Sequence, residues 1–263
     1  MKVSEKLDNF ELLYLELRRK LSSEELNSSV TFNLIQNNYQ VFKSLFEFLK
    51  QNLKCKDRMI DLGCGYGFAA FLFKSLLNFE DAWGIDIDVS RLNEAKKYIK
   101  TLRVDLEEDH LPFPDNYFDL ATSFGVLDHM VLWDNFFSEV YRILKLDSLL
   151  VICLTNLSGW DSRFSLLLGY QPRHIEVSKK HLVGVHRYYS TARYPVGHIH
   201  TSTFKATVEL GKCYGFKTVK TWGLKMHHDN LLTKLVDEFM HKFPSLSIRY
   251  LIILRKVGNE ASK

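Results

Sequence analysis

The sequence predicts an α/β protein built on an open, doubly wound, mostly parallel sheet of about seven strands. Short apolar segments alternate regularly with helical segments from residue 58 to about residue 155, which is typical of parallel strands joined by helical crossovers. The first strand runs into a glycine-rich turn, Gly63-Cys64-Gly65-Tyr66-Gly67, that leads directly into a helix. Such a turn is typical of the ligand-binding edge of these sheets.

The overall composition is that of a globular protein and excludes several functional classes. The chain has 263 residues, enough for one domain of this type with additions. No apolar run approaches the roughly 18 to 20 residues of a membrane span, and residues 1–10 are unlike a signal peptide, so we expect a cytoplasmic protein. The net charge of +4 is too small to indicate a nucleic-acid partner. The four widely spaced cysteines indicate neither disulfides nor a metal site.

Residues 1–53 are expected to form an N-terminal helical extension, followed by the main domain over residues 54–263. Leucines cluster at residues 12–17 in a charged background, and a second apolar helix is expected from about residue 34 to residue 49. Such helices either pad the sheet or cover a site, and the pattern leaves both interpretations open.

The expected strands and helices of the main domain then follow in order. In the first part we expect strands at 58–62, 82–86 and 102–105, with helices at 67–77 and 90–100. Next come a strand at 118–124, a helix at 135–144 with Asp134 as its N-cap, and a strand at 149–154 that is apolar throughout. The chain closes with a helix at 203–214, a strand at 216–222, a helix at 230–241 and a strand at 247–256.

The segment 156–200 interrupts this alternation, and we expect it to be an insertion that forms a cap after strand five. It has no clean period and holds five of the ten histidines. A loop region of this length is typically functional, and its aromatic residues argue against disorder. Its basic side chains either recognise an anionic ligand or form a solvated face: Arg163, Arg173, Lys179, Lys180, Arg187 and Arg193. Its tyrosines are either core or ligand contacts: Tyr170, Tyr188 and Tyr189.

The glycine turn does not match the dinucleotide fingerprint G-x-G-x-x-G, because Phe68 occupies the third glycine position. Asp61 lies immediately before the turn, where a carboxylate opposes a pyrophosphate but suits an ammonium or sulfonium group. Asp86 ends the second strand about 20 residues past the glycines, the separation of a ribose-binding acid. The pattern therefore favours a cationic nucleoside ligand over a dinucleotide.

Residues 61–67, DLGCGYG, resemble motif I (D-x-G-x-G-x-G) of the class I S-adenosylmethionine-dependent methyltransferases. The resemblance continues in order: residues 84–88 are similar to the family's second-strand motif, and residues 104–106 to its third-strand segment. Three further runs resemble small-molecule, type 11-like members: LPFPDNYFD at 111–119, FGVLDH at 124–129 and EVYRILK at 139–145. The resemblance covers about residues 58–156 and implies a Rossmann-like sheet.

The resemblance implies S-adenosyl-L-methionine as the cofactor and methyl transfer by in-line displacement. It implies these cofactor-binding residues: Asp61, Gly63, Cys64, Gly65, Gly67, Asp86, Ile87, Asp105, Leu106 and Phe124. In the family the second-strand acid takes the ribose hydroxyls and the third-strand acid meets the adenine amino group, although Asp105 would also suit a simple turn cap.

Two residues or segments depart from the family pattern. Lys145-Leu146-Asp147-Ser148 replaces the usual turn after the fourth crossover helix, so we expect a different turn there. The ring of Phe124 is expected to narrow the methyl-donor pocket.

Three histidines are the candidates for acid or base catalysis: His129, His198 and His200. A base is required only if the acceptor must lose a proton, so His129 is either a base or a packed histidine. The H-x-H pair at 198 and 200 offers a substrate-side base, and two histidines without further ligands do not define a metal site.

We expect the acceptor to be a small molecule or a glycan or lipid precursor, and an anionic one if the basic segment 156–200 contacts it. The tetrad N-P-P-Y of amino-group nucleic-acid methyltransferases is absent, because Ser123-Phe124-Gly125-Val126 stands in its place. The alternatives are an RNA or protein methyltransferase and a catalytically silent cofactor-binding protein. The sequence specifies neither the acceptor nor the oligomeric state.

Overall fold

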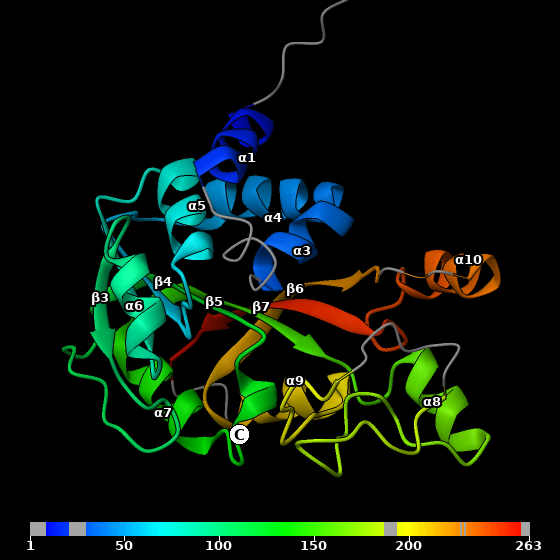
Figure 1. Ribbon diagram of the computed structural model, residues 1–263. Helices are drawn as coiled ribbons and strands as arrows, with labels where there is room; N and C mark the ends of the chain where they lie inside the picture. The colour runs from blue at the N-terminus through cyan, green and yellow to red at the C-terminus, as the bar shows by residue number, and fades with distance from the viewer. Residues whose placement is uncertain (1–8, 21–29, 187–193, 227, 229, 259–263) are drawn as a thin grey trace, which may run out of the picture.

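The computed structural model describes residues 9–20, 30–186, 194–226, 228 and 230–258 (Figure 1). Within these residues the strands form one seven-stranded sheet in the order β3-β2-β1-β4-β5-β7-β6, which confirms the predicted fold class. The strands are β1 (Arg58–Leu62), β2 (Asp81–Asp86), β3 (Lys100–Arg103), β4 (Phe118–Phe124), β5 (Leu144–Thr155), β6 (Phe216–Leu224) and β7 (Arg249–Lys256). Only β7 runs antiparallel to its neighbours, β5 and β6, so β6 points in the same direction as the parallel strands.

The described helices lie on both faces of the sheet (Figure 1). They are α1 (Asn9–Lys20), α3 (Val30–Asn37), α4 (Tyr39–Asn52), α5 (Phe68–Leu77), α6 (Val89–Ala95), the 3₁₀ helix η1 (Leu127–His129), α7 (Asp134–Ile143), α8 (Trp160–Leu167), α9 (Phe204–Cys213) and α10 (Leu231–Met240). None of them combines the length and the apolar character that a membrane span requires.

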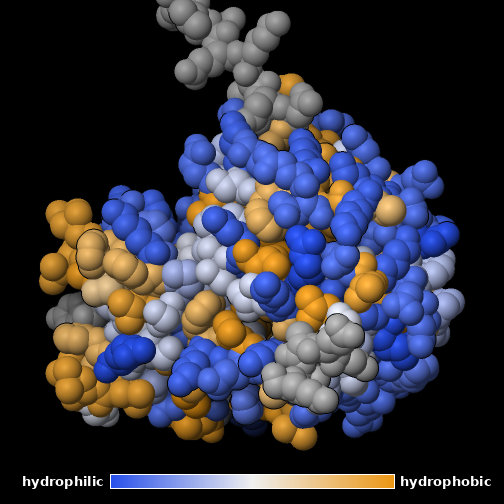
Figure 2. All heavy atoms as spheres, turned by 180° about the vertical axis from the view of Figure 1, so that it is seen from behind, coloured by the Kyte–Doolittle hydropathy of each residue, from blue (hydrophilic) through white to orange (hydrophobic). Residues whose placement is uncertain are grey.

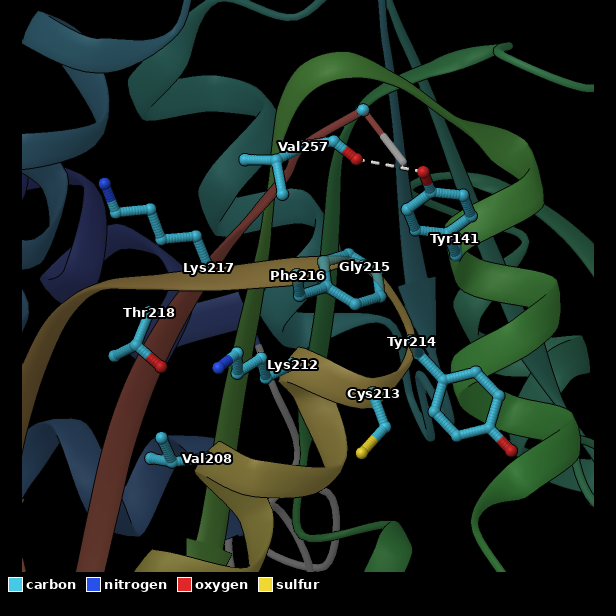
Figure 3. Close-up of a pocket in the computed structure, with 11 residues that line it drawn as sticks. Tyr141, Val208, Lys212, Cys213, Tyr214, Gly215, Phe216, Lys217, Thr218 and Val257 are labelled. Atoms are coloured by element: carbon cyan, nitrogen blue, oxygen red, sulfur yellow. Dashed lines mark hydrogen bonds between the residues drawn. The ribbon is translucent and has the colours of Figure 1, made fainter. Parts of the chain in front are cut away.

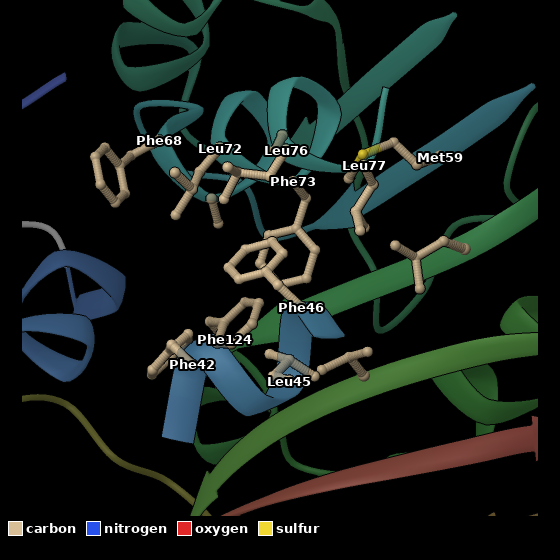
Figure 4. Close-up of a cluster of buried hydrophobic side chains, with 14 of the residues drawn as sticks. Phe42, Leu45, Phe46, Met59, Phe68, Leu72, Phe73, Leu76, Leu77 and Phe124 are labelled. Atoms are coloured by element: carbon tan, nitrogen blue, oxygen red, sulfur yellow. The ribbon is translucent and has the colours of Figure 1, made fainter. Parts of the chain in front are cut away.

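Aromatic side chains form the core between the sheet and the N-terminal helices α1, α3, α4 and α5. The ring of Phe73 lies 4.7 Å from that of Phe46 and 5.7 Å from that of Phe124, so α4, α5 and β4 meet at one point (Figure 4). The opposite face of the sheet packs against α7 and α9. Successive strand residues such as Met59 and Ile60 belong to different faces, which follows from the two-residue period of a strand.

The apolar helix expected from residue 34 to residue 49 is in fact two helices that meet at Asn38. The side-chain Nδ2 of Asn38 donates to the carbonyls of Leu34 at 3.1 Å and Lys225 at 3.0 Å. The same side chain accepts the N–H of Lys225 at 2.7 Å. The break therefore ties the N-terminal helices to the end of β6, a contact between residues distant in the sequence that no local pattern reveals.

Two local expectations around α7 are wrong. Asp134 is the first residue of the helix and not its N-cap, which is Trp133, and the Asp134 carboxylate instead accepts a hydrogen bond from the Tyr214 hydroxyl at 2.6 Å. The segment 145–148, expected to be a turn, lies within β5. There the pairing with β4 shifts and Asp147 adopts a left-handed φ of 66°, so the extra residues bulge out of the sheet.

Helix α8 lies within the segment 156–200, where no regular structure was expected. Its buried residues are mostly polar, namely Trp160, Asp161, Ser162 and Ser165, which explains why the sequence shows no apolar period there. Four residues named in the sequence analysis lie outside the described part of the chain: Arg187, Tyr188, Tyr189 and Arg193.

Helix α10 buries polar side chains and exposes apolar ones. Asp237 is buried and accepts hydrogen bonds from the Trp160 indole at 2.9 Å and the Met226 N–H at 2.9 Å. Apolar residues of α8 and α10 are more than half exposed instead, and Figure 2 shows them gathered at one end of the molecule: Leu166, Leu167, Leu231, Leu232, Leu235 and Phe239. Polar anchoring to α8, rather than burial of an apolar face, therefore fixes the orientation of α10.

Candidate functional site

A crevice of about 590 Å³ opens at the carboxyl ends of β1, β2 and β4. This is the edge at which open α/β sheets bind ligands, and the volume falls within the usual range for small-molecule pockets. Nine residues expected to form the site line it: Gly63, Cys64, Gly65, Asp86, Ile87, Asp105, Leu106, Phe124 and His129. Its walls also include residues that the sequence analysis did not propose as site residues: Tyr66, Phe68, Ala69, Arg91, Val104, Glu107, Gly125, Val126, Met130 and Val196.

The glycine turn between β1 and α5 brings bare backbone to the crevice. Gly63 has a φ of 76°, and a Cβ there would lie 2.3 Å from Cγ2 of Val126. Gly65 has a φ of 53°, and a Cβ there would meet no atom within 4 Å. Packing against the next loop therefore demands the first glycine, whereas the second leaves open space in which a ligand can approach the main chain.

Asp86 connects the end of β2 to this turn. Its Oδ2 accepts the N–H of Gly65 at 2.8 Å, and its Oδ1 accepts the N–H of Asp88 at 2.9 Å. A carboxylate offers about four acceptor positions, so each oxygen keeps capacity for one more donor. The side chain lines the crevice, so it both fixes the turn and presents acceptors to a ligand.

Asp61 lies behind the turn and is not among the residues that line the crevice. Its Oδ1 accepts the Thr122 hydroxyl at 2.6 Å, and the backbone of Ala70 in the first turn of α5 also bonds to the carboxylate. Burial raises the pKa of Asp61 to about 7, and the nearby Asp86 adds to this, although the Thr122 bond opposes it. The carboxyl therefore lies beneath the surface of the crevice, and its contact with a ligand cation stays a prediction.

The wall on the β3 side is acidic. Asp105 lines the crevice while its Oδ1 accepts the N–H of Glu107 at 2.9 Å, so it caps the turn as well. Glu107 accepts the N–H groups of Val131 at 2.9 Å and Leu132 at 3.1 Å, which holds the loop after η1 against this wall. With Asp86, the crevice presents three carboxylates and one guanidinium, that of Arg91.

Phe124, whose ring was expected to narrow the methyl-donor pocket, lines the crevice with only a small part of its surface. It is 6% exposed and packs in the core against Phe42, at 6.1 Å between ring centroids, and against Phe73. The reason is strand parity: residue 124 faces the α4–α5 side of the sheet, so only a small part of it reaches the crevice floor.

His129 lies at the rim of the crevice, at the end of η1. Its Nδ1 lies 2.9 Å from the carbonyl oxygen of Gly197. Because a carbonyl only accepts, Nδ1 carries the proton, and in the neutral ring Nε2 is the unprotonated nitrogen. The segment around Gly197 is held to η1 by the N–H of Ile199, which donates to the carbonyl of Asp128 at 2.8 Å.

The histidines of the H-x-H pair do not act together. His198 is buried with its ring 5.1 Å from that of His129, and burial lowers its pKa to about 4 although the Asp128 carboxylate opposes this. His200 is exposed and lies against Trp133, at 5.9 Å between ring centroids. Neither lines the crevice, and no group of three or more potential metal ligands occurs among the described residues. Gly67, also expected at the site, starts α5 without lining the crevice.

A second cavity, of about 710 Å³, lies at the opposite edge of the sheet (Figure 3). It surrounds the start of β6, between the end of α9 and Tyr141, whose hydroxyl donates to the carbonyl of Val257 at 2.9 Å. Among the described residues, the side chains that line it include Lys212 and Lys217 but no carboxylate. This is the amino edge of the parallel strands, where such sheets do not place their ligands, so we assign the functional site to the crevice.

Comparisons with known proteins agree with this geometry. Residues 60–152 match the family model described as a methyltransferase domain. The chain is 26% identical over 200 residues to the uncharacterized protein MJ1252 of Methanocaldococcus jannaschii, with 74% of each chain covered. It is 28% identical over 162 residues to the demethylmenaquinone methyltransferase of Lactobacillus johnsonii, covering 56% of this chain and 64% of that protein.

Among solved structures, the methyltransferase bound to the Trm112 methyltransferase activator of Haloferax volcanii matches with a TM-score of 0.57. The match covers 97% of this chain and all of that chain at 12% identity, a level at which the likeness concerns the fold alone. The matched methyltransferase-domain segment, the seven-stranded sheet and the ordered motifs together support a class I S-adenosylmethionine-dependent methyltransferase.

Proposed function

We propose that the chain binds S-adenosyl-L-methionine in the crevice and moves its methyl group, by in-line displacement, to a small-molecule acceptor or a glycan or lipid precursor. The observation that carries this proposal is the juxtaposition of the open backbone at Gly65 with the Asp86 carboxylate, 2.8 Å from its N–H. An acidic crevice beside bare backbone suits a cationic nucleoside, because the carboxylates attract the cation and accept from the ribose.

The residues proposed to hold the cofactor divide by chemistry. Asp86 would accept the ribose hydroxyls, and Asp105 the adenine amino group, while Ile87 and Leu106 provide apolar surface for the base. Asp61 would act from behind the turn, through its charge rather than through contact. Bound S-adenosylmethionine supplies an electrophilic methyl group on a sulfonium.

His129 is proposed as the general base for acceptors that must lose a proton. Its Nδ1–H is directed at the carbonyl of Gly197, so the lone pair on Nε2 is available to accept a proton. His198 would support it as a positioning residue, since the two rings lie 5.1 Å apart and the buried His198 is neutral at pH 7. His200, exposed against Trp133, is not supported as a base by any contact with the crevice.

The alternatives are an RNA or protein acceptor and a silent cofactor-binding protein. One relative is named for a small molecule, demethylmenaquinone, and another for ribosomal protein L11, so the names of the relatives support both acceptor classes. The structural neighbour is in complex with an activator protein, which suggests a specific form of the proposal, in which this chain also needs an activator. In that case the isolated chain would bind the cofactor without turning over.

Calorimetry with S-adenosylmethionine tests the proposal, and absence of heat at millimolar cofactor would refute both the enzyme and the silent binder. Incubation with methyl-labelled cofactor and a cell extract split by ultrafiltration then separates the acceptor classes. Label in the low-mass fraction supports a small molecule, label in protein or RNA supports the alternative, and no label in either supports a silent binder.

Cofactor affinity should rise with pH between pH 6 and pH 8. The carboxyl of Asp61 has its pKa raised to about 7 by burial, and a cation bound above it favours the ionised form, so binding releases a proton. The dissociation constant should therefore fall by up to about tenfold over this range. The matched Asp61→Asn variant removes the titrating group, and titrations of both proteins at three pH values give the difference. An identical pH dependence in the two proteins would disprove the role of Asp61.

A further inference from the structure

A small, partly open cavity of about 50 Å³ lies beside the cofactor crevice, on the side of the segment that follows β5. Four of the residues that surround it have basic or imidazole side chains, and they come from three separate segments: Arg173, His174, His198 and Arg249. Val196 lines both this cavity and the crevice. The two spaces are therefore neighbours, separated by one short stretch of chain.

Arg249 is the first residue of β7 and pairs in register with Thr155, the last residue of β5. Because β7 runs antiparallel, its first residue lies at the carboxyl edge of the parallel strands, the edge of the crevice. Two of its guanidinium nitrogens, Nε and Nη1, are buried and have no hydrogen-bond partner among the described residues. Buried guanidinium nitrogens without partners are unfavourable, and the usual partner of the donor fork is a carboxylate or phosphate.

Two buried histidines add donors around the same space. His174 is 3% exposed and His198 is 8% exposed, and their rings lie 5.7 Å apart. Nε2 of His174 and Nδ1 of His198 are buried without a hydrogen-bond partner among the residues that the structure describes. Burial, reinforced by the arginines, lowers the pKa of His174 well below its usual value, so both rings are neutral and each can offer one N–H.

The carboxylates near this cavity have other partners, although Oδ1 of Asp128 and Oδ1 of Asp161 are buried without a hydrogen-bond partner among the described residues. Glu176 accepts the N–H groups of Val196 at 2.6 Å and Gly197 at 2.7 Å. Asp128 accepts the N–H of Thr155 at 3.3 Å through Oδ2. Asp161 is buried and interacts with Arg173, yet burial still raises its pKa to about 6. Among the described residues, no carboxylate forms an ion pair with Arg249.

We propose that this cavity binds an oxyanionic group of the methyl acceptor, a carboxylate or a phosphate, held by Arg249, His174 and His198. The volume suits this group, because one water needs roughly 10–15 Å³ and the cavity therefore holds a few heavy atoms. From there the acceptor extends past His198 towards His129 and into the crevice. The rings of these two histidines lie 5.1 Å apart. The inference rests on the proposed methyl transfer and specifies its substrate class as anionic.

Thermal unfolding in added sodium phosphate or sodium acetate, against sodium chloride at the same ionic strength, tests the inference. At about ten times its dissociation constant, the bound anion should raise the melting temperature by about 3–5 °C. A shift with phosphate or with acetate supports the site and tells which oxyanion it prefers. If neither salt differs from chloride, the inference is wrong.

The variant Arg249→Met separates a ligand site from a structural arginine. A ligand site predicts that this variant keeps or raises its melting temperature in chloride, because an unpaired buried charge is removed, and that the anion shift disappears. Arg19→Met, an exposed arginine on α1, is the matched control and should keep the shift. An anion shift that persists in Arg249→Met would place the site elsewhere and overturn the inference.

A third variant covers the case in which Arg249→Met does not fold. Arg249→Lys keeps the charge without the planar fork and should lose at least about tenfold in anion affinity. Titration with S-adenosylmethionine is measured in parallel on the wild type. A chain that binds the cofactor but shows no anion effect refutes only this inference, whereas a chain that binds no cofactor refutes the proposed function itself.

Discussion

Replacing Asp86 with alanine should weaken S-adenosylmethionine binding by about a hundredfold or more. Under the proposed function the carboxylate accepts two ribose hydroxyls, and hydrogen bonds to a charged group contribute about 1.5–3 kcal/mol each, while 1.4 kcal/mol is a factor of ten in affinity. The substitution also removes the acceptors of the Gly65 and Asp88 N–H groups, which loosens the turn itself. Calorimetric titration of the cofactor measures the change.

Asp88→Ala is the matched control for this experiment. Asp88 is a carboxylate two residues away that caps α6 through the N–H groups of Ser90 and Arg91 and does not line the crevice. Its loss should slightly reduce the free energy of unfolding, because the N-cap of α6 is removed, and leave cofactor affinity nearly unchanged. Equal losses of affinity in the two variants would show that Asp86 acts only through the fold of this segment.

Gly63→Ala should destabilise the protein by about 3 kcal/mol, whereas Gly65→Ala should cost about 1 kcal/mol and chiefly impair cofactor binding. Both residues have a left-handed φ, so the backbone strain that an alanine would introduce is common to the two substitutions. The difference is space: a Cβ on Gly63 would lie 2.3 Å from Val126 Cγ2, and a Cβ on Gly65 would enter the open crevice.

Urea unfolding and cofactor titration of both glycine variants separate the two effects. We expect Gly63→Ala to have the lower urea midpoint of the two variants. We expect Gly65→Ala to have the lower cofactor affinity of the two, although it loses less stability. The opposite ranking would mean that Val126 moves aside easily and that the ligand does not approach the turn at Gly65.

Most residues of the crevice were predictable because their positions are set locally. Gly63, Gly65, Asp86 and Asp105 follow strand ends at fixed spacing, and the structure places them around one crevice. Asp61 lies at its predicted position in the sequence, but its side chain is directed away from the crevice, towards Thr122. Spacing along a strand fixes where a residue lies and leaves open which of two buried environments its side chain enters.

The groups proposed to bind the acceptor were not predictable, because they converge from distant segments of the chain. His129, His174 and His198 come together through tertiary contacts, and only the irrelevant spacing of His198 and His200 is visible in the sequence. Arg249 was expected only as part of the final strand, at residues 247–256. Helix α8 was missed because its inward face is polar, so its burial depends on partners such as Asp237 rather than on an apolar period.

The position of β7 has a consequence for how the protein acquires its shape. Although β7 is the last strand in the sequence, it lies between β5 and β6, and it pairs Leu149 with Arg255 across more than a hundred residues. Such long-range pairing forms slowly, so β1 to β5 can associate well before the sheet is complete. During synthesis β6 has no neighbour until β7 arrives, and the same step brings Arg249 to the crevice edge. The cavity that contains Arg249 should therefore form later during folding than the crevice at the ends of β1, β2 and β4.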